Sequence, residues 1–462
     1  MEKLLEKLFR VNRSLTGPGV RETLSIMNAE LDGVLAVHEV PSGTKAFDWT
    51  VPREWHLRGA RLVDEEHGTV FDTEAGATYL HVVGYSEPVS AVMNFKEFEE
   101  SGRIHTAHFV PHDAVTGRAG SLPWAVPYVT SYYSNPPTWG LCLAREQYWA
   151  LAKREPKRLA VEIDSVFVRK GFLTFADAII PGTAPRSTHP NSRDEIVLST
   201  YCCHPAGLAN NETSGLVLLT DLVNWWRSKP RRLSLRVIVA PETIGPIVYL
   251  AGADDSAESP IGPQSMLQTL QHRVLAGFTL TCVGGDGRFY VQQGRSSNLA
   301  SRVASAVIPG ARIIPWERRA SDERQWSAPL VDLPWATIFK THPTDPGYMH
   351  RYHTSADDLN YVHADQIRES AFYMREILTV LDEGVGARWT TRTLGEPMLG
   401  RRGLYKNVST VGSSADSRDL LNVWSLCDGR TSLQIAESLG LSLPAVEKNL
   451  RVLEEHGITW RR

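Results

Sequence analysis

Apolar runs of strand length alternate, through much of the chain, with longer stretches whose apolar residues recur at helical spacing. This alternation predicts strands joined by helices, with both faces of the sheet covered. We therefore expect an α/β fold with a mixed, mostly parallel sheet flanked by helices. The predicted strands are residues 159–168, 195–203, 233–240, 274–283 and 335–340. The predicted helices are residues 216–227, 243–251, 298–308 and 364–381.

The first part of the chain follows other patterns. Residues 1–15 mix Leu with charged residues as an amphipathic helix does, and residues 20–31 form a second predicted helix after a Gly-Pro-Gly turn. Residues 48–137 contain short β-prone runs bounded by turn residues. These runs are residues 49–57, 60–63, 69–71 and 79–83. We interpret 48–137 as a β-rich insert in a catalytic domain made of 1–47 and 138–386.

Residues 387–462 are predicted to be a winged-helix-like domain. A helix at 419–427 is followed by two more, at 432–439 and 443–456, with a Gly-Leu turn between the last two. The last of these helices carries Glu447, Lys448, Arg451, Glu454 and Glu455, and so has no excess of positive charge. A DNA reader needs Lys or Arg facing phosphates. Nucleic acid is therefore not expected as a partner.

Composition narrows the class of protein. The 462 residues carry a formal net charge of −3, and no apolar run reaches the roughly 20 residues that a membrane-spanning helix needs. The N-terminus lacks the apolar core of a signal peptide. Five cysteines, an odd number without framework spacing, are typical of reduced thiols. We expect a cytoplasmic protein with no membrane partner; the sequence is compatible with a homo-oligomer.

Three residues far apart in the chain could form one reaction centre. His204 follows a predicted strand, Glu242 lies at the next strand-to-helix junction, and His353 precedes a helix start. Catalytic residues of such sheets gather at the carboxyl ends of the strands. Two imidazoles and a carboxylate are the minimum for metal-assisted or general-base hydrolysis. Taken singly, each has a structural explanation, as a loop histidine or a helix cap.

Two further segments are candidates for substrate binding. Residues 320–325 place Asp322, Glu323 and Arg324 in one polar loop, which a solvated turn would explain equally well. Tyr133 belongs to an aromatic cluster at 128–139, and Tyr352 adjoins His353. Aromatic side chains either pack the insert or form a wall of the pocket.

These segments, in this order, resemble the dinuclear zinc aminopeptidases. His204 matches the first histidine of that family, Glu242 its general base and His353 its last histidine, while Ser214-Gly215 and Ser321-Asp322 match two of its short boxes. More narrowly, the chain is similar to bacterial aminopeptidase-like proteins from polysaccharide or natural-product gene clusters. That resemblance covers nearly the whole chain. The motifs that carry it include N-R-S-L-T-G-x-G-V-R-E-T-L (12–24), P-E-T-I-G (241–245), S-D-E-R-Q (321–325) and Y-H-T-S-x-D-D-L (352–359).

The departures from the family pattern concern metal ligands. Asn211 occupies the position of the bridging Asp, Thr243 that of the second Glu, and Thr281 that of a further Asp, which Asp286 is near enough to replace. A two-zinc site needs several anionic ligands. The resemblance therefore implies one zinc ion at most. His204, Asn211 and His353 would hold it, with Asp322, Glu212 or Asp286 as further candidates.

The resemblance implies a hydrolase in which Glu242 acts as general base. The expected reaction is cleavage of an aminoacyl or γ-glutamyl type of amide bond, in a small biosynthetic intermediate or a short peptide. The alternative is a catalytically impaired member of the family that binds a ligand or serves in regulation.

Overall fold

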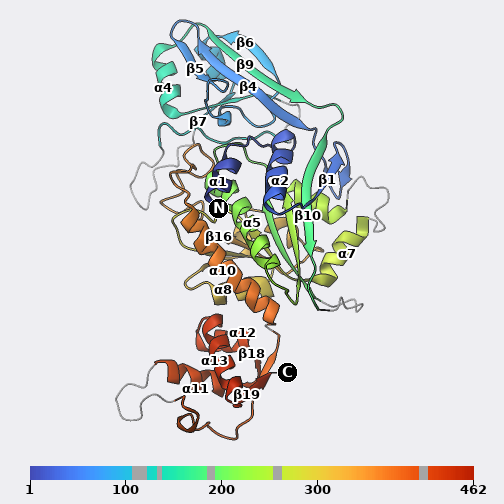
Figure 1. Ribbon diagram of the computed structural model, residues 1–462. Coiled ribbons are helices and arrows are strands. Elements are labelled where there is room, and N and C mark those ends of the chain that lie inside the picture. Colours follow the sequence, from blue (N-terminus) through green and yellow to red (C-terminus); the bar gives the residue numbers. More distant parts are fainter. Residues whose placement is uncertain are drawn as a thin grey trace.

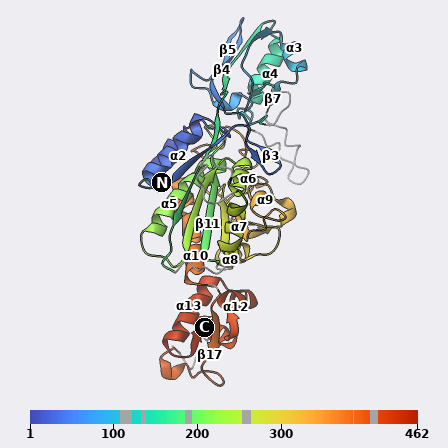
Figure 2. The same cartoon turned by 90° about the vertical axis from the view of Figure 1, so that its right-hand side faces the viewer.

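The computed structural model describes residues 1–106, 122–132, 138–184, 193–252, 263–384, 386–404 and 415–461. These residues form three units arranged along one axis (Figure 1). The insert and the winged-helix unit lie at opposite ends of a central unit, which contains an eight-stranded sheet (Figure 2).

The central sheet is mixed, with a parallel middle. Its order is β1-β10-β12-β11-β13-β16-β14-β15, and the four strands from β12 to β16 run parallel. β10 and β14 flank this parallel middle and run antiparallel to its edge strands, β12 and β16. The predicted mixed, mostly parallel sheet is thereby confirmed. The strands are β1 (Ala36–Pro41), β10 (Phe172–Ile180), β11 (Glu195–Tyr201), β12 (Ser234–Ala240), β13 (Val274–Leu280), β14 (Tyr290–Gln293), β15 (Arg312–Ile314) and β16 (Trp335–Phe339).

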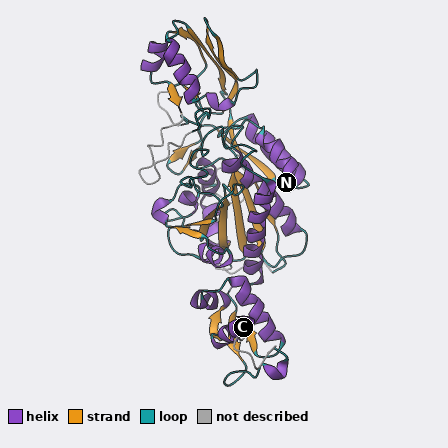
Figure 3. Ribbon diagram, turned by 90° about the vertical axis from the view of Figure 1, so that its left-hand side faces the viewer, coloured by secondary structure: helices purple, strands orange, loops and turns teal. Residues whose placement is uncertain are grey.

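Helices cover both faces of this sheet (Figure 3). Successive residues of β11 point to opposite faces, so that Leu198 joins one apolar core and Val197 the other. β11 is buried along its whole length, as expected for a strand covered on both sides. On the Leu198 side lie α1 (Glu2–Phe9), α2 (Pro18–Glu30), α5 (Ser214–Arg227), α8 (Leu299–Val307) and α10 (Ala364–Glu383). On the other side lie α6 (Ile244–Ala251), α7 (Pro263–Arg273) and α9 (Glu323–Trp326).

The insert has its own antiparallel sheet and its own apolar core. The sheet order is β5-β4-β9-β6, and a two-stranded β7-β8 pair and two helices accompany it. The elements are β4 (Trp55–Asp64), β5 (Gly68–Asp72), β6 (Val89–Met93), α3 (Phe95–Glu100), β7 (Ile104–Thr106), β8 (Leu141–Leu143), α4 (Arg145–Arg154) and β9 (Leu159–Phe167). A short hairpin of β2 (Lys45–Ala46) and β3 (Trp49–Thr50) precedes the sheet.

The insert differs from the sequence prediction in three places. The predicted strand 159–168 exists as β9, but its assignment to the central sheet was wrong, because β9 pairs with β4 and β6. Residues 79–83, predicted as a strand, contain a 3-10 turn at Tyr79–His81, since the Thr78 hydroxyl accepts a hydrogen bond from the Leu80 N–H and caps the turn. The predicted run 49–57 covers β3 and the start of β4, and β4 continues through a bulge at Leu57–Gly59 into the predicted run 60–63.

The winged-helix unit packs against the central unit. Its three-stranded sheet has the order β18-β17-β19, and its helices α12 and α13 lie against α8. Arg451 of α13 forms an ion pair of 2.8 Å with Glu383 of α10. The elements are β17 (Arg388–Thr391), α11 (Ala415–Ser425), β18 (Asp428–Thr431), α12 (Ser432–Leu439), α13 (Leu443–Glu455) and β19 (Thr459–Arg461). Among the helices that the structure describes, none combines the length and apolarity needed to cross a membrane.

Candidate metal-assisted hydrolase site

The candidate site lies where the parallel strands end. His204 follows β11, Glu242 follows β12 and Thr281 follows β13. The ring centroids of His204 and His353 are 5.7 Å apart, although 149 positions separate the two residues in the sequence. The Glu242 N–H donates to Sγ of Cys203, the residue before His204, at 3.3 Å. The three groups predicted to converge therefore do lie together at the carboxyl end of the sheet.

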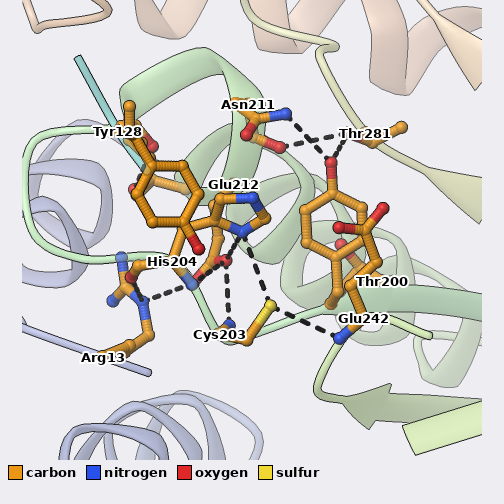
Figure 4. A network of polar contacts seen from close by, with 12 residues as sticks. Arg13, Tyr128, Thr200, Cys203, His204, Asn211, Glu212, Glu242 and Thr281 are labelled. Carbon is orange, nitrogen blue, oxygen red and sulfur yellow. Dashed lines mark hydrogen bonds and ion pairs between the residues drawn. The ribbon is translucent and has the colours of Figure 1, made fainter. Parts of the chain in front are cut away.

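A buried carboxylate fixes the orientation of the His204 ring. Oε2 of Glu212 accepts hydrogen bonds from His204 Nδ1 at 2.6 Å and from the backbone N–H groups of Cys203 and His204 (Figure 4). Because the carboxylate is an acceptor, Nδ1 carries a proton, and in the neutral ring the lone pair lies on Nε2. A histidine held in this way is typical of metal centres, where a carboxylate behind the ring sets its tautomer.

Arg13 neutralises Glu212 from the other side. Its Nε forms an ion pair with Oε1 of Glu212, and both side chains are fully buried. The same Nε donates to the His204 carbonyl at 3.1 Å. Burial acts to raise the pKa of Glu212, but the charge of Arg13 acts against it and keeps the pKa below its usual value. Glu212 is thus a charged carboxylate that supports His204.

Asn211 presents an unsatisfied oxygen in the same region. Its amide nitrogen donates to the Tyr201 hydroxyl at 3.1 Å and to Cys282 Sγ at 3.7 Å. Its Oδ1 is buried and has no hydrogen-bond partner in the described part of the chain. A carboxylate of Asp357 holds the backbone here, accepting from the N–H groups of Asn210 and Asn211 at 2.8 and 2.9 Å. A buried acceptor without a donor is costly, and a cation would satisfy it.

His353 is a neutral imidazole enclosed by aromatic rings. Burial, with a smaller contribution from His204, lowers its pKa to about 3. Its ring stacks on Tyr352 at 4.0 Å, and Tyr128 lies 5.2 Å from it and 5.1 Å from His204. His353 has a φ of 56°, a backbone conformation that non-glycine residues rarely adopt and that is often found at functional sites. A neutral imidazole can bind a metal ion, whereas a protonated one cannot.

Glu242 has the environment of a general base. Burial raises its pKa, while His204 and Arg324 act in the opposite direction. Ser321 donates a hydrogen bond of 3.1 Å to Oε1 of Glu242. Glu242 is partly exposed, whereas His204 is 2% exposed. The carboxylate can therefore meet a water molecule while the histidine lies deeper.

The predicted substrate loop lies beside Glu242. Asp322 accepts a hydrogen bond from the Thr243 N–H at 2.7 Å, and burial together with the nearby Glu242 raises its pKa well above the usual range. Arg324 donates to the Thr243 hydroxyl at 2.8 Å and is partly exposed. Glu323 is fully buried, and its carboxylate accepts from the N–H groups of residues 320 and 321 and from the Thr337 hydroxyl. These contacts favour a role for Glu323 in holding the loop, in place of the predicted contact with substrate.

The structure narrows the set of further metal ligands. Asp286 is exposed, whereas Thr281 is buried and hydrogen bonded to Tyr201 and to the Asn211 carbonyl, so the expectation that Asp286 replaces Thr281 is wrong. Cys203, His204 and Glu212 have possible ligand atoms within 4.8 Å of one another. Burial raises the pKa of the Cys203 thiol well above its usual range, however, and a neutral thiol is a poor ligand. Tyr133 lies outside the described residues.

Two residues of the site could not be recognised as site residues from the sequence. Arg13 is the second residue of the N-R-S-L-T-G motif, which has no metal-ligand pattern of its own. Tyr128 belongs to the aromatic cluster, and it reaches the histidines because its N–H donates to the His353 carbonyl at 2.7 Å. The five cysteines are all buried and unbridged, as expected for reduced thiols.

The fold and the position of these side chains define an aminopeptidase-like α/β protein. More specifically, the chain belongs to the family described as "Domain of unknown function (DUF4910)", whose model matches residues 2–384. Residues 387–460 match the model described as winged helix-turn-helix, so the predicted winged helix is confirmed.

Relatives and solved structures agree with this assignment. A Clostridium acetobutylicum protein named "Putative polysaccharide biosynthesis protein with aminopeptidase-like domain" is 30% identical over 456 residues, which cover 96% of this chain and 92% of that protein. A crystal structure of a "putative peptidase" from Clostridium acetobutylicum has 27% identity and a TM-score of 0.78, covering 100% of this chain and 95% of the other. BSAP, a zinc aminopeptidase from Bacillus subtilis, has 13% identity and a TM-score of 0.54, covering 81% and 93%, and at that identity the likeness shows the fold alone. The predicted resemblance and fold class are confirmed.

Proposed function

We propose that this protein is a metal-assisted hydrolase that cleaves an amide bond of the aminoacyl or γ-glutamyl type. Its substrate would be a small biosynthetic intermediate or a short peptide in the cytoplasm. The observation that carries the proposal is the convergence of three groups: two histidine rings with centroids 5.7 Å apart and one partly exposed carboxylate, Glu242.

The donor set fits one zinc ion. His204 offers Nε2 because Glu212 occupies Nδ1, and His353 is kept neutral. Asn211 offers an unpartnered oxygen. Because Asn211 and Thr243 lack the carboxylates of the two-zinc pattern, the positive charge of a second ion would find little compensation. A bound zinc ion would supply Lewis-acid chemistry, polarising the substrate carbonyl.

The side chains of the protein account for proton transfer and substrate orientation. Glu242 removes a proton from the attacking water, and its raised pKa lets it pass that proton to the leaving amine. The Ser321 hydroxyl holds the carboxylate in place at 3.1 Å. Arg324 and Tyr352, both partly exposed beside Glu242, are placed to bind the polar and apolar parts of the substrate.

Hydrolysis assays with a Glu242→Gln variant test this proposal. The wild-type protein is expected to hydrolyse aminoacyl or γ-glutamyl p-nitroanilides, and the variant to lose activity by about 10²- to 10⁴-fold, the usual contribution of a general base. The exposed Glu317, replaced by Gln, is the matched control and should keep full activity. Full activity in Glu242→Gln would exclude the mechanism.

Elemental analysis separates this proposal from its alternative, a catalytically impaired ligand-binding or regulatory protein. The missing carboxylates at 211 and 243 favour that alternative. A hydrolase of the proposed type should hold close to one zinc per chain, and His353→Ala should lose it. An inactive protein that holds no zinc after loading would favour the alternative.

A further inference from the structure

The residue that follows Glu242 has a strained backbone conformation. β12 ends at Ala240 and α6 begins at Ile244, so three residues turn the chain from strand to helix. Thr243, the last of them, has a φ of 66° and a ψ of −68°. The Ile244 N–H donates to the Glu242 carbonyl at 2.7 Å. These angles and this hydrogen bond define a γ-turn of the rare form with positive φ.

Threonine is an unfavourable residue for this turn. A positive φ is uncommon for any residue with a side chain, and for a β-branched one it is a genuine outlier. The γ-turn with positive φ is also strained in itself. Such conformations persist only where surrounding contacts hold them, and they occur often at active sites. The turn at Thr243 therefore needs contacts that hold it, and it directly adjoins the proposed general base.

Side chains of the predicted substrate loop supply these contacts. Oδ1 of Asp322 accepts a hydrogen bond from the Thr243 N–H at 2.7 Å. Nη2 of Arg324 donates to the Thr243 hydroxyl at 2.8 Å. The Ser321 hydroxyl donates to Oε1 of Glu242 at 3.1 Å. The loop thus holds both the backbone of the turn and the carboxylate beside it, although 79 positions separate Thr243 from Asp322.

The loop is itself anchored to the central sheet. Glu323 is fully buried, and its carboxylate accepts from two N–H groups of the loop and from the Thr337 hydroxyl on β16. Asp322 is 1% exposed, so its hydrogen bond to the Thr243 N–H is shielded from water and is stronger than an exposed one. A loop fixed in this way can impose a conformation on the turn that it contacts.

We propose that Asp322 is a positioning residue, which holds the strained turn at Thr243 and thereby fixes the backbone from which Glu242 reaches the attacking water. The inference rests on the proposed function, in which Glu242 is the general base. It gives Asp322 a role that is neither contact with substrate nor metal binding. Its carboxyl group acts as a hydrogen-bond acceptor for one N–H, a task that an uncharged amide oxygen can also perform.

Steady-state kinetics and zinc analysis of Asp322 variants test the proposal. Asp322→Ala should lower kcat by about 10²-fold, the effect of displacing a catalytic group by about 1 Å, and should change KM by less than about twofold. Asp322→Asn keeps the acceptor and should keep most of the activity. Both variants should hold as much zinc as the wild type. Glu317→Ala, an exposed carboxylate in the preceding turn, is the control and should match the wild type.

Two results of these measurements would overturn the proposal. Loss of zinc in Asp322→Ala would make Asp322 a metal ligand. An equal loss of kcat in Asp322→Asn and Asp322→Ala would mean that the carboxyl group acts through its charge or its proton, because the acceptor alone would then not suffice.

A double-mutant cycle with Thr243→Gly determines whether Asp322 acts through the turn. Glycine adopts a positive φ without steric cost, so the turn then depends less on Asp322. The loss of kcat caused by Asp322→Ala should therefore be smaller by a factor of about five or more in the Thr243→Gly background, as for residues that act on one feature. Equal losses in the two backgrounds would contradict the proposal.

Crystal structures of the variants separate a failure of this inference from a failure of the proposed function. In Asp322→Ala the φ of Thr243 should become negative and the hydrogen bond from the Ile244 N–H to the Glu242 carbonyl should be lost, whereas Asp322→Asn should keep both. A wild-type protein without hydrolase activity would disprove the proposed function, and this comparison would still decide whether Asp322 holds the turn. An unchanged turn in Asp322→Ala would overturn the inference whatever the activity.

Discussion

At the scale of single residues, the most informative group is Glu212. The sequence left it as a possible metal ligand, but the structure places it behind His204, with one oxygen on Arg13 and the other on three N–H groups. This arrangement explains how the site can keep a fixed imidazole although residue 211 is an uncharged asparagine. The negative charge is on the next residue, Glu212, which lies behind His204.

Removing either partner of the Arg13–Glu212 pair should destabilise the fold strongly. Glu212→Gln leaves a buried guanidinium without its counter-charge, and breaking such a pair costs about 3–5 kcal/mol. Urea unfolding followed by circular dichroism measures the change. Arg61→Gln, which breaks the exposed pair with Glu162, is the control and should leave the unfolding midpoint almost unchanged. A comparable loss in both variants would contradict the buried-pair explanation.

His81 should make the stability of the protein sensitive to acid. Burial lowers its pKa to about 4 from 6.5, although its Nδ1–H donates to the Cys142 carbonyl at 2.7 Å. Between these pH values the unfolded chain binds a proton that the folded chain does not, so stability falls as pH decreases from 6.5 to 4. The full difference corresponds to about 3 kcal/mol.

Unfolding free energies measured at pH 7 and pH 4.5 test this effect. The loss on acidification should be smaller in His81→Gln than in the wild type. The exposed His272, replaced by Gln, should leave the loss unchanged. An identical pH dependence in the His81 variant would show that other groups are responsible.

At the scale of elements, the contact between α5 and the sheet determines where Asn211 and Glu212 lie. Both belong to a π-helical turn, Ala209–Thr213, that leads into α5. Gly215 lets α5 approach the sheet, since a Cβ there would lie 2.5 Å from the Leu280 carbonyl oxygen and 2.5 Å from Thr200 Oγ1.

Gly215→Ala should therefore cost stability and disturb the site together. Overpacking of this kind costs about 1–3 kcal/mol, and the displaced turn should also weaken metal binding. Thermal unfolding and zinc titration measure the two effects. Gly347→Ala is the matched control, because its Cβ would meet nothing within 4 Å and its stability should be unchanged. Normal stability in Gly215→Ala would show that α5 can shift without cost.

Some strands could be predicted from the sequence and others could not. Strands β11, β12, β13 and β16 were predicted correctly because they are long apolar runs between helices. β9 was predicted but placed in the wrong sheet, although its buried and exposed residues alternate as in a sheet with one solvated face. β10 was not predicted. It pairs antiparallel with β1 and β12, and so it lacks the following helix that made the parallel strands recognisable in the sequence.

At the scale of the whole molecule, residues that follow strands were predictable, and residues supplied by distant segments were not. His204 and Glu242 could be inferred because the topology of an α/β sheet brings strand ends together, whereas His353, in the loop between β16 and α10, was inferred from its motif. Arg13 and Tyr128 reach the same site from the N-terminal loop and from the segment beside the insert. Their positions depend on how distant segments of the chain pack together, which local sequence patterns do not encode. A division into 1–47 with 138–386, 48–137 and 387–462 stays a prediction, although the pairing of β9 favours an insert that extends to about residue 167.

The packing of the winged-helix unit argues against DNA binding by the intact protein. Helix α13, which corresponds to the recognition helix of such modules, lies against α8, and Arg451, one of its two basic residues, is paired with Glu383. Burial also raises the pKa of Glu447 on this helix. A DNA backbone would meet a helix with more acidic than basic residues and with part of its surface covered.

The full-length protein is therefore expected to show no binding to duplex DNA in fluorescence anisotropy at about 50 mM salt, where phosphate contacts are strongest. An affinity that falls steeply between about 50 and 200 mM salt would contradict this expectation, because such a slope counts the phosphates that a protein neutralises. The Glu383→Ala variant is the more stringent test of DNA binding, because it removes the ion-pair partner of Arg451. If the variant also fails to bind, the contact between α13 and α8 and the charge of α13 are sufficient to exclude DNA, and the winged helix serves as a packing unit of the peptidase-like fold.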